Sequence, residues 1–233
     1  MLRVLRVAPL LILLGCGAPP PPPPPPPTTP PPPPERTDPG PVEMRSEIGG
    51  LPEEAMNRAF RSLDGPIQAC FDEATGRNPA LGGRFTLKMR IGSDGRPRWA
   101  YLSETDLGDR TLERCVLDLA RDKQWPKPLG GDGLAERSYE IDARSPVKEL
   151  EEKWVKPAVA KARTNAWKCR KGKLRGRVRA TVHIAPNGKV LGASITPPDE
   201  RFEEVADCVA EEIGKIRFGK VGRRMKLTFE IFW

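Results

Sequence analysis

The chain has 233 residues and a formal net charge of +8, from 39 Lys and Arg against 31 Asp and Glu. This length accommodates two small domains and a leader. His183 is the only histidine, so a Ser-His-Asp or Cys-His arrangement would have to use this residue. The sequence has no CxxC or HxxxH spacing, which argues against a metal site.

The charge is distributed unevenly along the chain. Residues 44–143 hold 15 Lys/Arg and 17 Asp/Glu, whereas residues 144–233 hold 21 and 11, so the two parts carry −2 and +10. A basic half raises the question of nucleic acid binding. The leader argues against that partner, because it directs the chain out of the cytoplasm.

The first 16 residues are typical of a bacterial secretory leader. Two arginines precede an apolar run at 7–14 that is too short to span a bilayer. The letters LLGC at 13–16 resemble a lipobox, which implies a signal peptide at 1–15 and lipidation of Cys16. The alternative is an ordinary cleaved signal with an incidental cysteine. Because Gly17 follows instead of aspartate, the enterobacterial sorting pattern implies a lipid-anchored protein facing the periplasm on the outer membrane, with the inner membrane or cell surface as alternatives.

A linker at 16–44 follows the leader. Its segment Pro19–Pro34 contains 14 prolines in 16 positions. Such a run adopts polyproline II at about 3.1 Å per residue, so it predicts a stiff spacer of roughly 50 Å. The alternative role is a ligand for a proline-binding domain.

The next segment has helical periodicity. Apolar residues recur at helical spacing over 53–74. Asp64-Gly65-Pro66 interrupts this stripe, and an aspartate N-cap followed by proline predicts a break into two short helices.

A β-hairpin comes next. Apolar and polar residues alternate over 84–91, as in a strand with one buried face. Asp94-Gly95 predicts a type I′ turn into a second strand that reaches Ser103. A further apolar stripe over 112–120 predicts a helix that covers the sheet, and residues 137–142 predict a short third strand.

The hairpin is repeated later in the chain. Residues 81–103 align without a gap on residues 174–196, at a shift of 93 residues, and the same shift places Cys115 on Cys208. Helical stripes at 155–169 and 202–213 and a strand at 226–233 complete the second copy. The sequence therefore predicts an α+β protein of two tandem αββαβ modules, at 45–143 and 144–233, each a three-stranded antiparallel sheet covered by two helices.

Four cysteines other than Cys16 fall one in each predicted covering helix. Three pairings are possible. The register of the duplication selects Cys70 with Cys115 and Cys169 with Cys208, which would stabilise small cores in an oxidising compartment. Four buried thiols are the alternative.

The first copy resembles the C-terminal domain of TonB and TolA, and more closely that of the AgmX/PglI gliding-motility proteins of myxobacteria. The shared segments are IQACF at 67–71, NPALGG at 78–83, IGSDG at 91–95, LGD at 107–109, ERCV at 113–116 and WPKP at 125–128. The second copy matches more loosely. The resemblance implies a TonB C-terminal-like fold and a protein-binding role in a motility or envelope-spanning assembly.

Two departures limit what the resemblance implies. TonB-like proteins span the inner membrane, whereas this chain is predicted to carry a lipid anchor, which argues against energy transduction. The motility proteins carry other domains that this sequence lacks, so a motility role is an association only.

The sequence shows no catalytic constellation and implies no cofactor, so we expect a non-enzymatic binding protein; an envelope enzyme is the remote alternative. Acidic pairs such as Glu203-Glu204 are expected on the solvent side of a helix. The candidate binding face is basic, with Arg175, Arg177 and Arg179 expected on one side of a strand. Preceding basic residues extend it: Lys168, Arg170, Lys171 and Lys173.

This basic face suits an acidic envelope protein or an anionic polymer such as peptidoglycan or lipopolysaccharide. One alternative is a structural peptidoglycan- or lipopolysaccharide-binding lipoprotein without a motility role. A second is partner-strand addition at an open sheet edge, and a third is a solvated face that only aids solubility.

Overall fold

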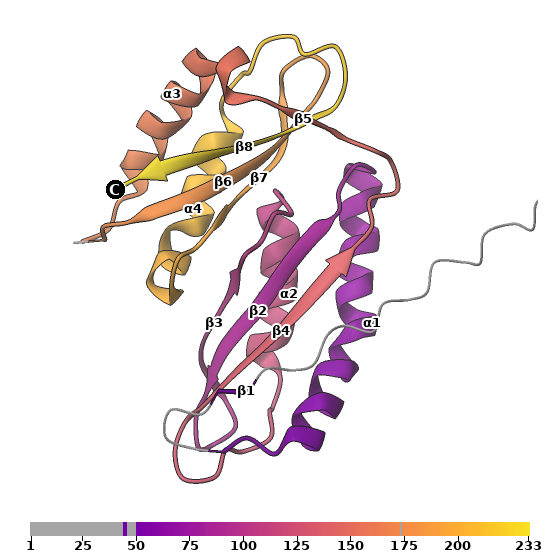
Figure 1. Ribbon diagram of the computed structural model, residues 1–233, viewed down its shortest axis with the longest axis vertical. Helices are drawn as coiled ribbons and strands as arrows, with labels where there is room; N and C mark the ends of the chain where they lie inside the picture. Colours follow the sequence, from indigo (N-terminus) through magenta and orange to yellow (C-terminus); the bar gives the residue numbers. More distant parts are fainter. Residues whose placement is uncertain (1–43, 46–49, 173) are drawn as a thin grey trace, which may run out of the picture. The chain divides into compact units, whose positions relative to one another are not determined.

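The computed structural model describes residues 44–45, 50–172 and 174–233, all within one compact unit, Thr37–Trp233. The fold is mixed α and β: the described residues form four α-helices and two β-sheets, and each sheet has its own hydrophobic core (Figure 1). None of these helices combines the length and apolar character needed to cross a bilayer. The predicted lipidation site, Cys16, lies outside the described residues.

The first sheet is antiparallel, with strand order β1-β4-β2-β3. Helices α1 and α2 cover one face of it (Figure 1). The bounds are β1 Met44–Arg45, α1 Glu53–Arg77, β2 Gly83–Ile91, β3 Pro97–Ser103, α2 Arg110–Asp122 and β4 Gly133–Ile141. The predicted alternation is confirmed, because Phe85, Leu87, Met89 and Ile91 of β2 are buried in this core.

The second sheet has the order β5-β8-β6-β7, in which only the β5–β8 pair is parallel. Val178, Ala180 and Val182 of β6 are buried against α3 and α4. The helices and strands are β5 Lys148–Leu150, α3 Lys156–Ala166, β6 Arg177–Ile184, β7 Val190–Thr196, α4 Glu203–Gly214 and β8 Met225–Phe232. Three 3₁₀ turns flank the helices: η1 Glu152–Trp154, η2 Trp167–Cys169 and η3 Glu200–Phe202.

The prediction of three strands per sheet was incomplete. The three long strands are present in each sheet, but β1 adds two residues to the edge beside β4, and β5 adds three beside β8. Segments of two or three residues are too short to show an alternation of apolar and polar residues, so the sequence does not predict them. They join the sheets through backbone hydrogen bonds to β4 and β8.

The predicted break in the first helix was wrong. Helix α1 runs without interruption for 25 residues, with Pro66 inside it. Pro66 is exposed, whereas Leu63 and Ile67 on either side of it are buried in the core. Burial of the apolar face on both sides of the proline therefore outweighs the lost backbone hydrogen bond.

The predicted type I′ turns were also wrong. A type I′ turn needs positive φ at two consecutive residues, but only Gly95 (φ +80°) and Gly188 (φ +81°) have it in these turns. Asp94 and Asn187 instead accept hydrogen bonds through their side chains, from Arg96 N at 3.0 Å and Lys189 N at 3.1 Å. Each turn is thus a longer loop that ends on a left-handed glycine, and the strand register shifts next to it.

The predicted disulfide pairing is confirmed. Cys70 of α1 is bonded to Cys115 of α2, and Cys169 of η2 to Cys208 of α4, with Cα–Cα distances of 6.1 and 5.6 Å. Each bond ties together the two helical segments that cover one sheet. The pairing selected from the sequence is therefore the one that the structure contains.

Candidate functional site

The structure divides the predicted basic residues into two groups. Arg177 and Arg179 lie on β6, and their side chains project from the face of the second sheet opposite its core. Arg175 is exposed but precedes the strand, which begins at Arg177, so the expectation of three arginines on one strand was wrong. Lys173 lies outside the described residues.

The other basic residues point elsewhere. The Nζ of Lys168 lies 3.4 Å from Glu212 Oε2, and the Nζ of Lys171 donates to the carbonyl of Glu204 at 3.3 Å. Arg170 places its guanidinium over the Trp167 ring, at 5.4 Å from the ring centroid. These three residues border α3 and α4, so they do not extend the surface formed by Arg177 and Arg179.

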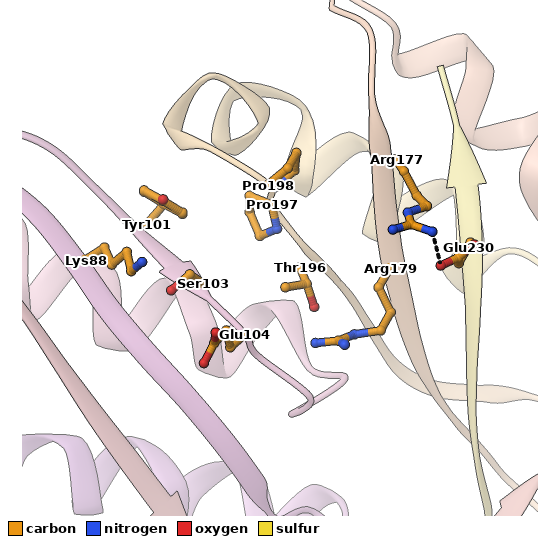
Figure 2. Close-up of a pocket in the computed structure, with 10 residues that line it drawn as sticks. All are labelled: Lys88, Tyr101, Ser103, Glu104, Arg177, Arg179, Thr196, Pro197, Pro198 and Glu230. Carbon is orange, nitrogen blue, oxygen red and sulfur yellow. Dashed lines mark ion pairs between the residues drawn. The ribbon is translucent and has the colours of Figure 1, made fainter. Parts of the chain in front are cut away.

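A groove lies beside the two β6 arginines (Figure 2). Its volume is about 350 Å³. One wall comes from β2, β3 and the residue after β3, and the other from β6, β7, β8 and the residues after β7. The lining residues are Lys88, Tyr101, Ser103, Glu104, Arg177, Arg179, Thr196, Pro197, Pro198 and Glu230.

Two of the three cations in the groove are paired. Lys88 Nζ lies 3.0 Å from Glu136 Oε2, and Arg177 Nη1 lies 3.3 Å from Glu230 Oε1 (Figure 2). Burial opposes the charge on Lys88, but Glu136 outweighs burial and raises the lysine pKa. Arg179 is exposed and has no ion pair with any carboxylate of the described residues. Within the described part of the chain, the groove therefore presents one guanidinium without a carboxylate partner.

Three neutral residues of the groove, Tyr101, Ser103 and Thr196, carry hydroxyl groups. Burial raises the pKa of Tyr101, so its phenol stays protonated at neutral pH and can donate. Glu104, just after β3, has φ +54°, and no other described residue besides glycine has a positive φ. The cationic side chains and hydroxyl groups of the groove suit capture of a carboxylate or phosphate.

Sequence reasoning missed that the loop after β3 covers the rest of this sheet face. His183 is 1% exposed, and its Nε2 lies 2.9 Å from the carbonyl oxygen of Leu107. Thr196 Oγ1 donates to the Thr105 carbonyl at 2.6 Å, and Lys226 Nζ lies 3.2 Å from Asp106 Oδ2. The polar side of β6 is therefore buried at His183 and open only near Arg177 and Arg179.

An ion cluster joins α2 to α4. Arg110 contacts Glu203 Oε1 at 2.5 Å and Asp207 Oδ1 at 2.7 Å, and Arg121 contacts Glu203 Oε1 at 3.1 Å. The Glu203 side chain is 11% exposed, so the expectation that this acidic pair faces solvent was wrong for Glu203. The pattern of residues in α4 alone could not predict that Arg110, almost a hundred residues earlier, contacts Glu203.

Glu113 is a buried acid beside this cluster. Its Oε1 accepts from Thr105 Oγ1 at 2.8 Å, and its Oε2 lies 3.6 Å from Arg110 Nη1. Burial raises the pKa of Glu113 to about 7, against the opposing charge of Arg110. The neighbouring Ser194 hydroxyl also lowers this pKa, without reversing the effect of burial. Glu113 is 1% exposed, so the fold closes this carboxyl off from solvent.

Among the described residues, no three His, Cys, Asp or Glu side chains form a cluster suited to a metal ion. Comparisons with protein-family models, curated proteins and solved structures found no match to this chain.

Proposed function

We propose that this chain is a non-enzymatic lipoprotein of the bacterial cell envelope, with two tandem TonB C-terminal-like αββαβ modules on a stiff proline-rich spacer. The lipobox-like leader and the motifs shared with the AgmX/PglI domain support this proposal. The equivalent disulfides of the two sheets add to it, since such bonds persist in an oxidising compartment. The setting is the periplasmic side of the outer membrane, in a motility or envelope-spanning assembly.

The binding role is assigned to the groove beside β6. The observation that carries it is the exposed Arg179 guanidinium, which has no carboxylate partner in the described part of the chain and lines the same groove as Arg177 and Lys88. A guanidinium matches the geometry of carboxylates and phosphates, which acidic envelope proteins, peptidoglycan and lipopolysaccharide all carry. The groove therefore binds an anionic group of an envelope partner.

The double substitution Arg177→Glu/Arg179→Glu tests this role. It changes the local charge from +2 to −2 and leaves the buried neighbours Val178 and Ala180 in place. Binding of the full chain to envelope fractions at low salt, measured by co-sedimentation, should fall at least about tenfold, because the local field is inverted.

A matched control uses Arg223→Glu/Arg224→Glu, the same charge change at two exposed arginines between α4 and β8. This control should bind as the parent does. If both variants bind like the parent, the β6 arginines form only a solvated surface. If both lose binding equally, net charge rather than the groove holds the partner.

The lipid anchor has its own test. The substitution Cys16→Ala should release the protein from the membrane fraction or block its maturation, because the lipidated residue is lost. Fractionation and electrophoretic mobility measure this. Unchanged partition and mobility would show that Cys16 is an incidental residue after an ordinary signal.

Strand addition is the second candidate function. Strand β3 is an edge of the first sheet and pairs only with β2. Trp99 and Tyr101 share one face of it, with ring centroids 5.7 Å apart. Trp99 is half-buried, so its exposed part could contact a side chain of an added strand. This binding would rest on backbone hydrogen bonds and would depend little on salt.

A further inference from the structure

Two tryptophans at the ends of helix α3 are exposed. Trp154 of η1 is 72% exposed and Trp167 of η2 is 50% exposed. Each ring has a cation nearby: Lys153 Nζ lies 5.4 Å from the Trp154 centroid, and Arg170 Cζ lies 5.4 Å from the Trp167 centroid. Neither indole belongs to the second core, so packing of the fold does not explain them.

The exposed side of α3 between these tryptophans is basic. The helix buries Val159, Ala162 and Ala166 in the core. Exposed lysines follow the opposite spacing: Lys156, Lys161 and, just beyond the helix, Lys168. Exposed residues and buried residues thus form two separate stripes, as in an amphipathic helix whose polar face is cationic.

Lys168 pairs with Glu212 of α4, but folding does not account for Lys156 and Lys161. Lys156 is the first residue of α3, where the helix dipole disfavours a positive charge. Neither Lys156 nor Lys161 forms an ion pair with a carboxylate of the described residues. A cationic surface flanked by exposed indoles is therefore maintained without a benefit to folding.

We propose that this α3 surface, defined by Trp154, Lys156, Lys161, Trp167 and Lys168, docks the protein on an anionic lipid headgroup layer. An indole buries its ring at the boundary between headgroups and acyl chains while its N–H stays hydrated. Lysine stems lie along the apolar boundary while their ammonium groups reach anionic headgroups. Exposed indoles and lysines together therefore favour binding at the interface of an anionic bilayer. The inference goes beyond the proposed function, because the surface is separate from the groove.

The test uses the full chain incubated with vesicles of phosphatidylcholine and phosphatidylglycerol whose acyl chains carry bromine, which quenches nearby tryptophans. Anionic vesicles should quench the emission strongly, and vesicles of phosphatidylcholine alone should quench it weakly. The substitution Trp154→Phe/Trp167→Phe should remove most of the quenching, whereas Trp99→Phe should not.

Charge variants identify the docking surface. Lys156→Glu/Lys161→Glu should raise the concentration of anionic lipid needed for half-maximal quenching by about tenfold. Lys189→Glu/Lys220→Glu, the same change at two exposed lysines elsewhere, should leave it unchanged. Equal quenching of the two charge variants, or no quenching of the parent, would overturn the proposal.

The groove variant Arg177→Glu/Arg179→Glu separates the two proposals. It should keep the vesicle response, so failure of the groove proposal leaves this result intact. If instead the groove variant loses the response while the α3 variant keeps it, the lipid contact lies at the groove, and the α3 surface is not the docking site.

Discussion

Replacing Glu113 with glutamine should abolish most of the loss of stability that the parent chain shows as the pH rises from about 5 to 8. The pKa of Glu113 is raised from 4.5 to about 7 by burial. A raised pKa stabilises the folded state fully below the unfolded value, and this contribution is lost as the pH rises through the folded value. Ionisation of Glu113 in the folded protein should therefore lower the free energy of unfolding by about 3 kcal/mol.

Burial, and not the net effect of the neighbouring charges, sets the sign of this effect. Arg110 favours ionisation, and Thr105 donates to the carboxylate. Glu203, from α4, opposes ionisation and shares Arg110 with Glu113. The raised pKa means that burial outweighs Arg110, so a neutral glutamine, which cannot ionise, should be more stable than the parent at pH 8.

Urea unfolding at a series of pH values measures the effect. The matched control Glu211→Gln removes an exposed carboxylate from α4 and should keep the parental pH dependence. Parallel profiles of unfolding free energy against pH for the parent and Glu113→Gln would contradict this prediction. They would show that ionisation of Glu113 does not destabilise the folded state.

Removing the disulfide of the first sheet is expected to lower the free energy of unfolding by about 4 kcal/mol, through Cys70→Ala/Cys115→Ala. The bond closes a loop with a sequence separation of 45. Closing such a loop lowers the conformational entropy of the unfolded chain, which gives this magnitude. Its counterpart, Cys169→Ala/Cys208→Ala, closes a separation of 39 and should cost nearly as much. Chemical denaturation with and without a reductant measures both values.

Peptide mapping under non-reducing conditions provides the control for pairing. Peptides that contain Cys70 and Cys115 should be joined, as should those that contain Cys169 and Cys208. A bridge between the two sheets, or free thiols in periplasmic material, would contradict the pairing. If a reductant left the parent as stable as before, the bonds would form without stabilising the fold.

The repeat explains why much of the fold was predictable from the sequence. Alternation fixed the buried side of β2 and β6, since a one-residue error would have placed Arg84 or Arg177 in the core. The shift of 93 residues places Cys115 on Cys208, and the one remaining cysteine of each copy, Cys70 or Cys169, completes each pair. Both signals are local or repeated in the sequence, so they can be read without knowledge of long-range contacts.

The errors arose where distant segments meet. Pro66 stays inside α1 because the core holds Leu63 and Ile67 on either side of it, which helix signals alone do not register. Glu203 was expected on the solvent side of its helix, yet Arg110 and Arg121 from the first half of the chain contact it. Alternation shows which residues share a face but not what lies over that face.

The same limit applied to the candidate site. The sequence grouped seven basic residues by proximity along the chain, whereas the structure sends Lys168 and Lys171 toward α4 and leaves Arg177 and Arg179 at the groove. Lys88 and Tyr101 joined the site from the first sheet, with no sequence signal to mark them.

The most direct test of the binding role is a salt titration of the full chain against envelope fractions separated into outer membrane, peptidoglycan and soluble periplasm. Charge capture by Arg177 and Arg179 predicts that binding to one fraction falls steeply between low and moderate salt, because exposed charges are screened over about 10 Å at 0.1 M. Binding that stays constant across this range would contradict the groove and favour strand addition at β3.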